Sequence, residues 1–538
     1  MCVMSIKSWL VSAFVRNYPQ TPVGRDGMLK LESALNEKSA FQLVLRNEEN
    51  SGPVEVKICA NGGKKFDVRI RRVGYVPMLH FNTPVEGPED CEGLNHLPGL
   101  VPDPLFDEDS IKLPARETHS FWITLRPKST IKTGKHKITI TRQAEGQAAR
   151  KHTVEITVHN VRLAPRKNFH ITHWFYTDAI IDWYKTDGYD KSFWKLLPVY
   201  LKNLADHCQD TVLVPLFTPP VDGVKTPCQL LKVKKTGQDK YNFDFSDVRK
   251  YIQIAKQSGI RYFEWSHLVT QWGAEHAIRV YKGQGKTRKL LWPVKTSATA
   301  ATYKTFLSQL LPRLYSFLKK EKLLTTSLFH LSDEPHGPEH LANYHAFRNY
   351  LKQAAPWMRV MDAMSDVEFA KTGMTDIPVA NQGVLMDFIK TGVPSWVYYC
   401  CNPRGKFLNH LMDTPLSKIA MHGFLCYRFD IGGFLHWGYN FWYRRHTTDL
   451  IDPFTISDAG DWPEWAFGDT FLVYPGPEGP IDSIRWEVIG LGFQDYQLLQ
   501  TIGINRNDKL LEDIRDFADF PKTEKQRTSL RSKLLNAM

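Results

Sequence analysis

The alternation of short apolar runs with longer amphipathic runs, from residue 169 to residue 440, limits the fold more than any other feature of this chain. Short runs rich in β-branched and aromatic residues predict strands, and amphipathic runs at helical spacing predict helices. The eight predicted strands are residues 169–176, 211–217, 260–266, 327–333, 358–363, 376–381, 395–400 and 433–440. Eight strands that alternate with helices belong to the α/β class and predict a (β/α)8 TIM barrel.

A doubly wound open sheet is the alternative architecture. Such a sheet usually carries a glycine-rich turn after its first strand. The corresponding segment here, "HWFYTDAI" at residues 173–180, contains no glycine, so the barrel is favoured. Within the predicted helix at 192–207 we expect Pro198 to break the helix, because proline removes a backbone donor and crowds the preceding turn.

The first 165 residues have a different pattern. Runs such as "SAFQLVLRN", "HSFWITLRP" and "HTVEITVHN" alternate apolar and polar residues and are separated by turn residues, which predicts an all-β sandwich. A chain of 538 residues is too long for one ordinary core. We therefore expect a sandwich domain at 1–165, a barrel domain at 166–505 and a C-terminal helical extension at 506–538, with Pro165 at the first boundary.

Composition narrows the range of partners. The formal net charge is +12, but the basic residues are scattered and form no nucleic-acid motif, so we expect no nucleic-acid binding. No segment reaches the roughly 18 uncharged apolar residues of a membrane span, so we expect no membrane insertion. Aromatic residues make up 12% of the chain and include 15 Trp, which suits either a large core or flat platforms for sugar rings.

The cysteines and the N-terminal segment bear on the compartment. The 8 cysteines show no CxxC pair, and the adjacent Cys400 and Cys401 cannot readily form an ordinary disulfide with each other, which favours a reducing compartment. The first 20 residues contain only a short apolar run, interrupted by Lys7 and Arg16, without a small-residue cleavage site. We expect folded protein here and a cytoplasmic location.

Two adjacent acids, Asp333 and Glu334, follow the apolar run of the fourth predicted barrel strand. In a TIM barrel the active site lies at the C-terminal ends of the strands, and carboxylates are rarely buried without partners. The position therefore indicates a catalytic pair, although an acid pair alone is a weak motif. The alternative is that Asp333 caps the following helical segment while Glu334 is solvated.

The seventh predicted strand decides how such a pair could act. The usual retaining glycosidase has a second carboxylate about 5 to 5.5 Å from its general acid, and that partner typically comes from the seventh strand. Here the segment "SWVYYCCNP" contains no acid. If the substrate carries a 2-acetamido group, its carbonyl oxygen can act as the nucleophile, with Asp333 orienting the amide and Glu334 acting as general acid and then general base.

Four motifs carry a family resemblance. In order they are "HLSDEP", "WVYYCCNPRG", "GFLHWGYNFW" and "SIRWEVIGLGFQDY". Together they resemble glycoside hydrolase family 123, the β-N-acetylgalactosaminidase family, over most of residues 1–505. The resemblance implies a retaining, substrate-assisted exo-hydrolase that releases β-linked N-acetylgalactosamine, and it aligns Asp333 and Glu334 with the catalytic pair of the family.

The resemblance also implies roles for other residues. Tyr398 would hydrogen-bond the acetamido carbonyl, and Trp437 would form the apolar floor of the sugar subsite. His267 and Asn440 would contact sugar hydroxyls, but for each of them a single structural hydrogen bond is an equally good expectation. Arg485 and Glu487 are expected to hold the C-terminal helix against the barrel, because arginine favours bidentate structural pairing.

The sequence thus predicts an enzyme that hydrolyses terminal β-N-acetylgalactosaminides on a glycan, with no metal or organic cofactor. One alternative is hydrolysis of another 2-acetamido sugar, such as a β-N-acetylglucosaminide, by the same machinery. The other is a glycan-binding protein without activity. The presence of both Asp333 and Glu334 argues against this second alternative. The aglycone and the oligomeric state do not follow from the sequence.

Overall fold

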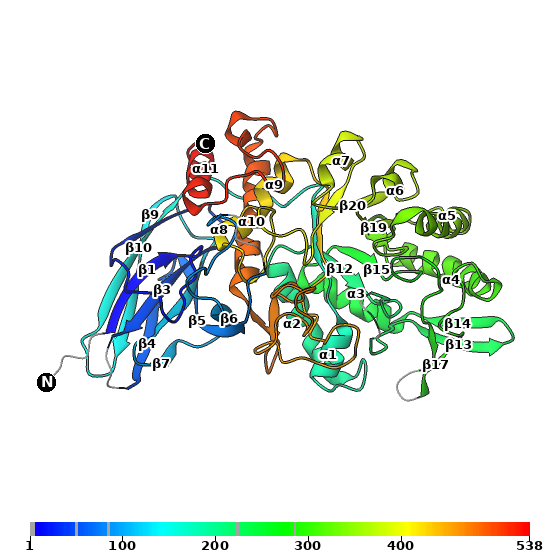
Figure 1. Cartoon of the computed structure of the whole chain (residues 1–538), viewed down its shortest axis with the longest axis horizontal. Coiled ribbons are helices and arrows are strands. Elements are labelled where there is room, and N and C mark those ends of the chain that lie inside the picture. The colour runs from blue at the N-terminus through cyan, green and yellow to red at the C-terminus, as the bar shows by residue number, and fades with distance from the viewer. Residues whose placement is uncertain are drawn as a thin grey trace.

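The structure is a computed structural model with a strand-rich N-terminal region followed by a mixed α/β region (Figure 1). It describes residues 6–48, 52–82, 87–221, 223, 225–283 and 287–537. Within this part of the chain, none of the helices is both long enough and apolar enough to cross a membrane.

The N-terminal region consists of two five-stranded sheets, ordered β1-β3-β8-β5-β6 and β2-β10-β9-β4-β7. The strands are β1 Ile6–Ser12, β2 Leu29–Ser33, β3 Ser39–Asn47, β4 Val54–Asn61, β5 Phe66–Met78, β6 Gly99–Phe106, β7 Ser110–Leu113, β8 Thr118–Pro127, β9 Gly134–Ala144 and β10 Arg150–Val158. Neighbours are antiparallel except β2 and β10, which are parallel.

Strand β8 shows how the first sheet is buried on both faces. Phe121, Ile123 and Leu125 belong to a core that the two sheets share, whereas Trp122 points the other way into the large core of the α/β region. Successive side chains of a strand alternate between faces, so this sheet lies between the second sheet and the rest of the molecule.

The α/β region contains two all-parallel sheets, ordered β12-β15-β18 and β11-β22-β21-β20-β19. The strands are β11 His170–His173, β12 Thr211–Val214, β15 Tyr262–Trp265, β18 Ser327–Phe329, β19 Met361–Met364, β20 Ile377–Asn381, β21 Trp396–Tyr398 and β22 Gly433–His436. A parallel bridge between Phe329 and Val360 joins β18 to the residue before β19. Next to β12, the Asp210 N–H donates to the Ile171 carbonyl of β11.

At least one helix separates each pair of strands that follow one another in these two sheets. The helices are α1 Thr177–Trp183, α2 Lys191–Asp206, α3 Ser246–Ser258, α4 Ala301–Lys320, α5 Gly337–Ala354, α6 Val367–Lys371, α7 Leu385–Lys390, α8 Leu416–Ile419, α9 His422–Arg428, α10 Ile484–Ile502 and α11 Glu524–Asn536, with 3-10 turns at Leu324–Thr326 and Lys509–Leu511. The remaining strands are β13 Lys232–Gly237, β14 Lys240–Asp244, β16 Tyr281–Lys282, β17 Lys289–Leu290, β23 Val473–Pro475 and β24 Pro480–Asp482.

The expectation that Pro198 breaks its helix is wrong. Helix α2 runs through the proline, and buried side chains lie on both sides of it, from Phe193 and Leu197 to Tyr200 and Leu204. Packing of this apolar face outweighs the cost of about 3 kcal/mol for a proline inside a helix.

Arg485 and Glu487, at the start of α10, tie the N-terminal sheets to the α/β region. Arg485 donates two hydrogen bonds of 3.0 Å to Asp103 of β6, and Glu487 pairs with Arg71 of β5 at 2.7 Å and with Lys38 at 3.0 Å. The prediction placed both residues against the barrel. Arg485 does also reach backbone carbonyls of that region, but the carboxylates and cations that satisfy the two side chains come largely from the sheets.

Candidate active site

The two adjacent acids lie just beyond β18, on a loop that its neighbours hold in place. The Glu334 N–H donates to the Ala363 carbonyl of β19 at 3.1 Å, and the Trp272 N–H donates to the Asp333 carbonyl at 2.6 Å. The Asp333 carboxylate is buried and accepts a hydrogen bond of 2.9 Å from the Gln271 amide. Glu334 is half-buried. The pair is thus one sequestered carboxylate beside one that solvent can reach.

The backbone around the pair is strained. Glu334 has a φ of 45°, Trp272 a φ of 62° and Ala274 a φ of 50°. Residues other than glycine seldom adopt this left-handed region, and such strain costs of the order of 1–3 kcal/mol and clusters at functional sites. Three such residues lie on two loops that contact each other, which indicates a functional site at this place.

Tyr398, at the end of β21, contacts Glu334. Its hydroxyl donates a hydrogen bond to the Glu334 Oε1 atom. Burial raises the pKa of Tyr398 well above its ordinary value, and the nearby Glu334 carboxylate raises it further. The phenol therefore stays protonated, and it orients the Glu334 carboxyl group from the side of β21, where no carboxylate stands.

Trp437 follows β22 and is held by an acid that the sequence reasoning did not single out. The indole N–H donates to Asp469 Oδ2 at 2.9 Å, and only 9% of the Trp437 surface is exposed. The other carboxylate oxygen of Asp469 lies 3.3 Å from His436 Nε2. A fully buried Asp in the "GDTFLVYPGP" segment that ends up beside this indole is recognisable only once the loop is folded.

His267 is fully buried and stacks on His330 with a centroid distance of 4.6 Å. Burial lowers the pKa of His267 well below its ordinary value, and the His330 charge lowers it further. For His330, burial lowers the pKa, but hydrogen bonds and charges of Asp362 and Glu264 outweigh it and raise the pKa to about 9. His267 is therefore neutral and stacks on His330, which is buried, charged and paired with Asp362 and Glu264.

Asn440 is also fully buried. Its Oδ1 accepts from the Tyr176 N–H at 2.8 Å, and its Nδ2 donates to the Tyr176 carbonyl at 3.0 Å. These two bonds clamp the segment after β22 to the segment after β11. They correspond to the structural alternative that the sequence reasoning left open for this residue.

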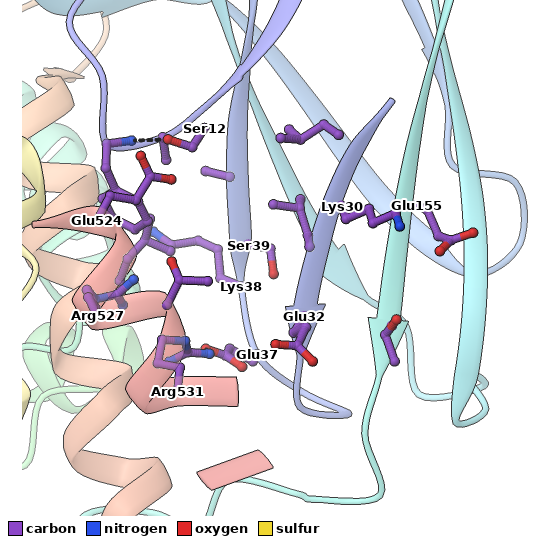
Figure 2. A pocket seen from close by; sticks show the side chains of 18 of the residues that line it. Ser12, Lys30, Glu32, Glu37, Lys38, Ser39, Glu155, Glu524, Arg527 and Arg531 are labelled. Atoms are coloured by element: carbon purple, nitrogen blue, oxygen red, sulfur yellow. Dashed lines mark hydrogen bonds and ion pairs between the residues drawn. The ribbon is translucent and has the colours of Figure 1, made fainter. Parts of the chain in front are cut away.

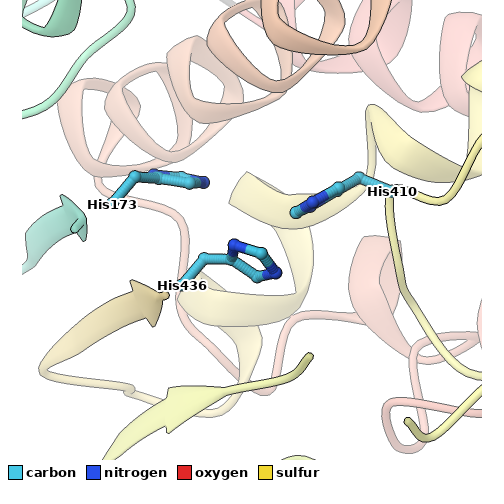
Figure 3. Close-up of side chains that lie close together, drawn as sticks. All are labelled: His173, His410 and His436. Atoms are coloured by element: carbon cyan, nitrogen blue, oxygen red, sulfur yellow. The ribbon is translucent and has the colours of Figure 1, made fainter. Parts of the chain in front are cut away.

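Three buried histidines, His173, His410 and His436, lie close enough to hold a metal ion, with their candidate ligand atoms within 4.8 Å of one another (Figure 3). Burial is the main cause that lowers the pKa of all three, that of His436 to about 3. His436 already accepts from the Gly438 N–H at Nδ1 and faces Asp469 at Nε2. Among the residues that the structure describes, the Nε2 atoms of His173 and His410 have no hydrogen-bond partner.

A second such group, His207 with Asp482 and Glu487, is already neutralised by cations. Arg71 lies 2.6 Å from the Asp482 carboxylate and 2.7 Å from that of Glu487. A metal ion there would meet the charge of this arginine.

The cavities that stand out lie elsewhere. One of about 390 Å³ lies between the N-terminal strands and α11 (Figure 2). Charged side chains of both signs line it and pair with each other, as Arg531 does with Glu37 at 2.5 Å. None of the predicted site residues lines this cavity, so the acid pair is identified by its chemistry and not by this cavity.

Comparison with known proteins relates this chain to a protein family. The family model "Glycoside hydrolase 123, catalytic domain" matches residues 174–502. A family 123 glycoside hydrolase from Clostridium perfringens, described in terms of glycolipid glycan hydrolysis, superposes with a TM-score of 0.75 at 15% identity, over 99% of this chain and 98% of its own. No curated protein matches.

More distant structures resemble the chain only loosely. A Bacteroides ovatus GH5 xyloglucanase has a TM-score of 0.33 at 10% identity, over 87% of this chain and 98% of its own. A GH10 xylanase from termite gut has a TM-score of 0.34 at 9% identity, over 70% of this chain and 90% of its own. These two similarities are too low to support an argument.

The fold and the family match define a glycoside hydrolase. The chain belongs to glycoside hydrolase family 123, as the motifs around Asp333, Tyr398 and Trp437 predicted.

Proposed function

We propose that the protein is a retaining exo-glycosidase that removes terminal β-linked N-acetylgalactosamine, with the 2-acetamido group of the substrate as the nucleophile. One observation carries the proposal. Asp333 and Glu334 are adjacent and separately held, by Gln271 and Tyr398, while β21 ends in a tyrosine instead of the second carboxylate of an ordinary retaining enzyme.

The fold supports the same proposal. Eight parallel strands with intervening helices suit a (β/α)8 barrel that begins near residue 166, behind an N-terminal β-sandwich. In that barrel Asp333 and Glu334 follow the fourth strand at its C-terminal end, where barrel enzymes carry their catalytic groups.

In the first step Glu334 donates its proton to the glycosidic oxygen. The acetamido carbonyl oxygen attacks the anomeric carbon, the bond to the aglycone breaks, and a cyclic oxazolinium ion forms. Asp333 accepts the acetamido N–H and stabilises the positive charge of this intermediate. Its fixed orientation matters because a preorganised acceptor needs no rearrangement as charge develops.

In the second step the Glu334 carboxylate takes a proton from water. The water oxygen attacks the anomeric carbon from the face that the aglycone left, and the bond to the acetamido oxygen breaks. Two inversions give net retention. Tyr398 keeps Glu334 in position throughout, and Trp437 offers its ring to the apolar face of the sugar.

The proposed substrate class rests on a structural relative. The Clostridium perfringens enzyme is described by glycolipid glycan hydrolysis, and for this chain we propose a glycolipid glycan that ends in N-acetylgalactosamine. Hydrolysis of a β-N-acetylglucosaminide stays the second candidate, because the same acid pair serves both sugars.

Paired 4-nitrophenyl glycosides test the proposal. We expect the wild type to hydrolyse the β-N-acetylgalactosaminide faster than the β-N-acetylglucosaminide, and the Glu334→Gln variant to lose activity by about 10²-fold or more. A preference for the glucosaminide would replace the first substrate with the second. Binding of the sugar without release of nitrophenol would indicate a glycan-binding protein instead.

A further inference from the structure

An exposed tryptophan lies next to the acid pair without a structural reason to be there. Trp272 is 42% exposed and holds a φ of 62°. Among the described residues its ring contacts no other aromatic ring, whereas the indole of Trp174 meets His267 edge to face and that of Trp437 lies tilted against Phe441. Backbone strain clusters at functional sites, and an exposed indole at such a place offers a flat apolar face to a ligand.

The loop that carries Trp272 is fastened to the catalytic loop at several points. The Trp272 N–H donates to the Asp333 carbonyl at 2.6 Å, and Gln271 donates to the Asp333 carboxylate at 2.9 Å. On either side, the Ser332 hydroxyl donates to the Thr270 carbonyl at 2.7 Å. Asn343 of α5 donates to the Gly273 carbonyl at 3.2 Å. The backbone of Trp272 is therefore held at a fixed place beside Asp333.

Two histidines, His336 and His340, lie beside the same two loops. His336 and His340 contact each other edge to face at 4.5 Å, and the His336 N–H donates to His340 Nδ1 at 3.3 Å. His340 Nε2 lies beside Gly273, the neighbour of Trp272. His336 Nδ1 faces the Glu334 carbonyl at 3.3 Å.

These contacts assign the protons of the two rings. His340 accepts at Nδ1, so in the neutral ring its proton is on Nε2. His336 faces the Glu334 carbonyl at Nδ1, so Nδ1 carries a proton, and in the neutral ring its Nε2 is an acceptor. The pair thus offers one donor and one acceptor, which matches a sugar hydroxyl group.

We propose that Trp272, His336 and His340 form a subsite for the sugar residue that leaves with the aglycone. The inference rests on the proposed function, in which Glu334 protonates the glycosidic oxygen, because the leaving sugar must then lie beyond Glu334. The chain continues there directly into His336 and His340. The indole covers the apolar face of that sugar, and the two imidazoles bind its hydroxyls.

Binding energy from such a remote contact is used in the transition state, so it should appear in kcat/KM for substrates that have the leaving sugar. The test compares a soluble disaccharide, β-N-acetylgalactosamine linked to galactose, with N-acetylgalactosaminyl β-fluoride, which lacks the sugar. For Trp272→Ala we expect kcat/KM to fall about tenfold on the disaccharide and to change less than about twofold on the fluoride.

Further variants serve as controls for this comparison. Trp272→Phe should keep most of the disaccharide activity, and Trp272→Gly preserves the left-handed backbone if the alanine variant is unstable. Trp194→Ala removes a partly buried tryptophan of α2 and should leave the rates on both substrates unchanged. His340→Ala should lower the disaccharide rate alone.

Each other outcome overturns the inference. An equal loss on both substrates would mean that Trp272 only supports the catalytic loop, and no loss would mean that it contacts no sugar. A loss confined to glycolipid in phosphatidylcholine vesicles would make Trp272 a membrane contact. If the wild type hydrolyses neither soluble substrate, the proposed function itself fails, which is a distinct result.

Discussion

At the scale of single residues, the acid pair is the part of the proposed site that follows most directly from the sequence. Two adjacent acids after an apolar strand identified Asp333 and Glu334, and the missing acid near Tyr398 suggested how they divide their work. The sequence contained no sign that Gln271 and Trp272 would hold Asp333, because they lie 62 and 61 positions earlier in the chain. Hydrogen bonds over such separations are set by the fold and not by local pattern.

Substitution of the buried acid tests substrate assistance. Asp333→Asn keeps the size of the side chain but removes the charge that stabilises the oxazolinium ion, so we expect kcat to fall by about 10²-fold or more. A thiazoline analogue of the intermediate should inhibit the wild type and bind the variant more weakly. An analogue that fails to inhibit the wild type would contradict substrate assistance.

At the scale of elements, the positions of the eight strands of the α/β region were predictable from the sequence and their lengths were not. Each of the eight predicted strands overlaps an observed one, but pairing often ends early, as at Phe329, where the predicted run continues to Asp333. Helix α9 and helix α10 approach so closely at Gly423 that an added Cβ would lie 2.2 Å from the Gly492 carbonyl oxygen. Such lengths and approaches depend on packing between elements that are remote in the sequence.

Removal of one hydroxyl group tests the contact between β21 and the loop after β18. Tyr398→Phe removes the donor to Glu334, and hydrogen bonds to charged groups contribute about 1.5–3 kcal/mol. We therefore expect kcat/KM on the disaccharide to fall about tenfold to a hundredfold, and less on the fluoride, which needs little acid catalysis.

Tyr184→Phe serves as the control for this variant, since its hydroxyl bonds Tyr200 and the Gly476 carbonyl. It should leave the ratio of the two rates unchanged. The same loss on both substrates in Tyr398→Phe would assign the tyrosine a purely structural role.

At the scale of the whole molecule, buried ion pairs join the N-terminal sheets to α10. Arg71, Lys38 and Glu487 are all nearly inaccessible to solvent. Burial alone would raise the pKa of Glu487, but the charges of Lys38 and Arg71 outweigh it and hold the pKa well below its ordinary value. Folding therefore depends on the ionised carboxylate.

Removal of that carboxylate should be costly. Glu487→Gln leaves the buried Lys38 without its carboxylate and Arg71 with Asp482 alone, and we expect the free energy of unfolding in urea to fall by about 3–5 kcal/mol. Glu368→Gln removes an exposed partner of Lys371 and should change it by less than about 0.5 kcal/mol. Equal stability of the two variants would contradict this role for α10.

The pH dependence has a definite sign. Because the pKa of Glu487 is lower in the folded protein, its contribution is present above the ordinary value of 4.5 and is lost as the pH falls below it toward the folded pKa. The wild type should therefore lose stability in that window more steeply than Glu487→Gln. Parallel curves for the two proteins would contradict the linkage.

The sequence by itself determined the eight strands of the α/β region and the family, and it proposed the acid pair, because these depend on periodicity and on residues that are neighbours in the chain. Only the tertiary structure decided what surrounds that pair. It brought Tyr398 to Glu334 and Trp272 to Asp333, and it gave Asn440 a structural bond to Tyr176. These contacts arise where strands distant in sequence end side by side, and no local pattern encodes which loops then meet.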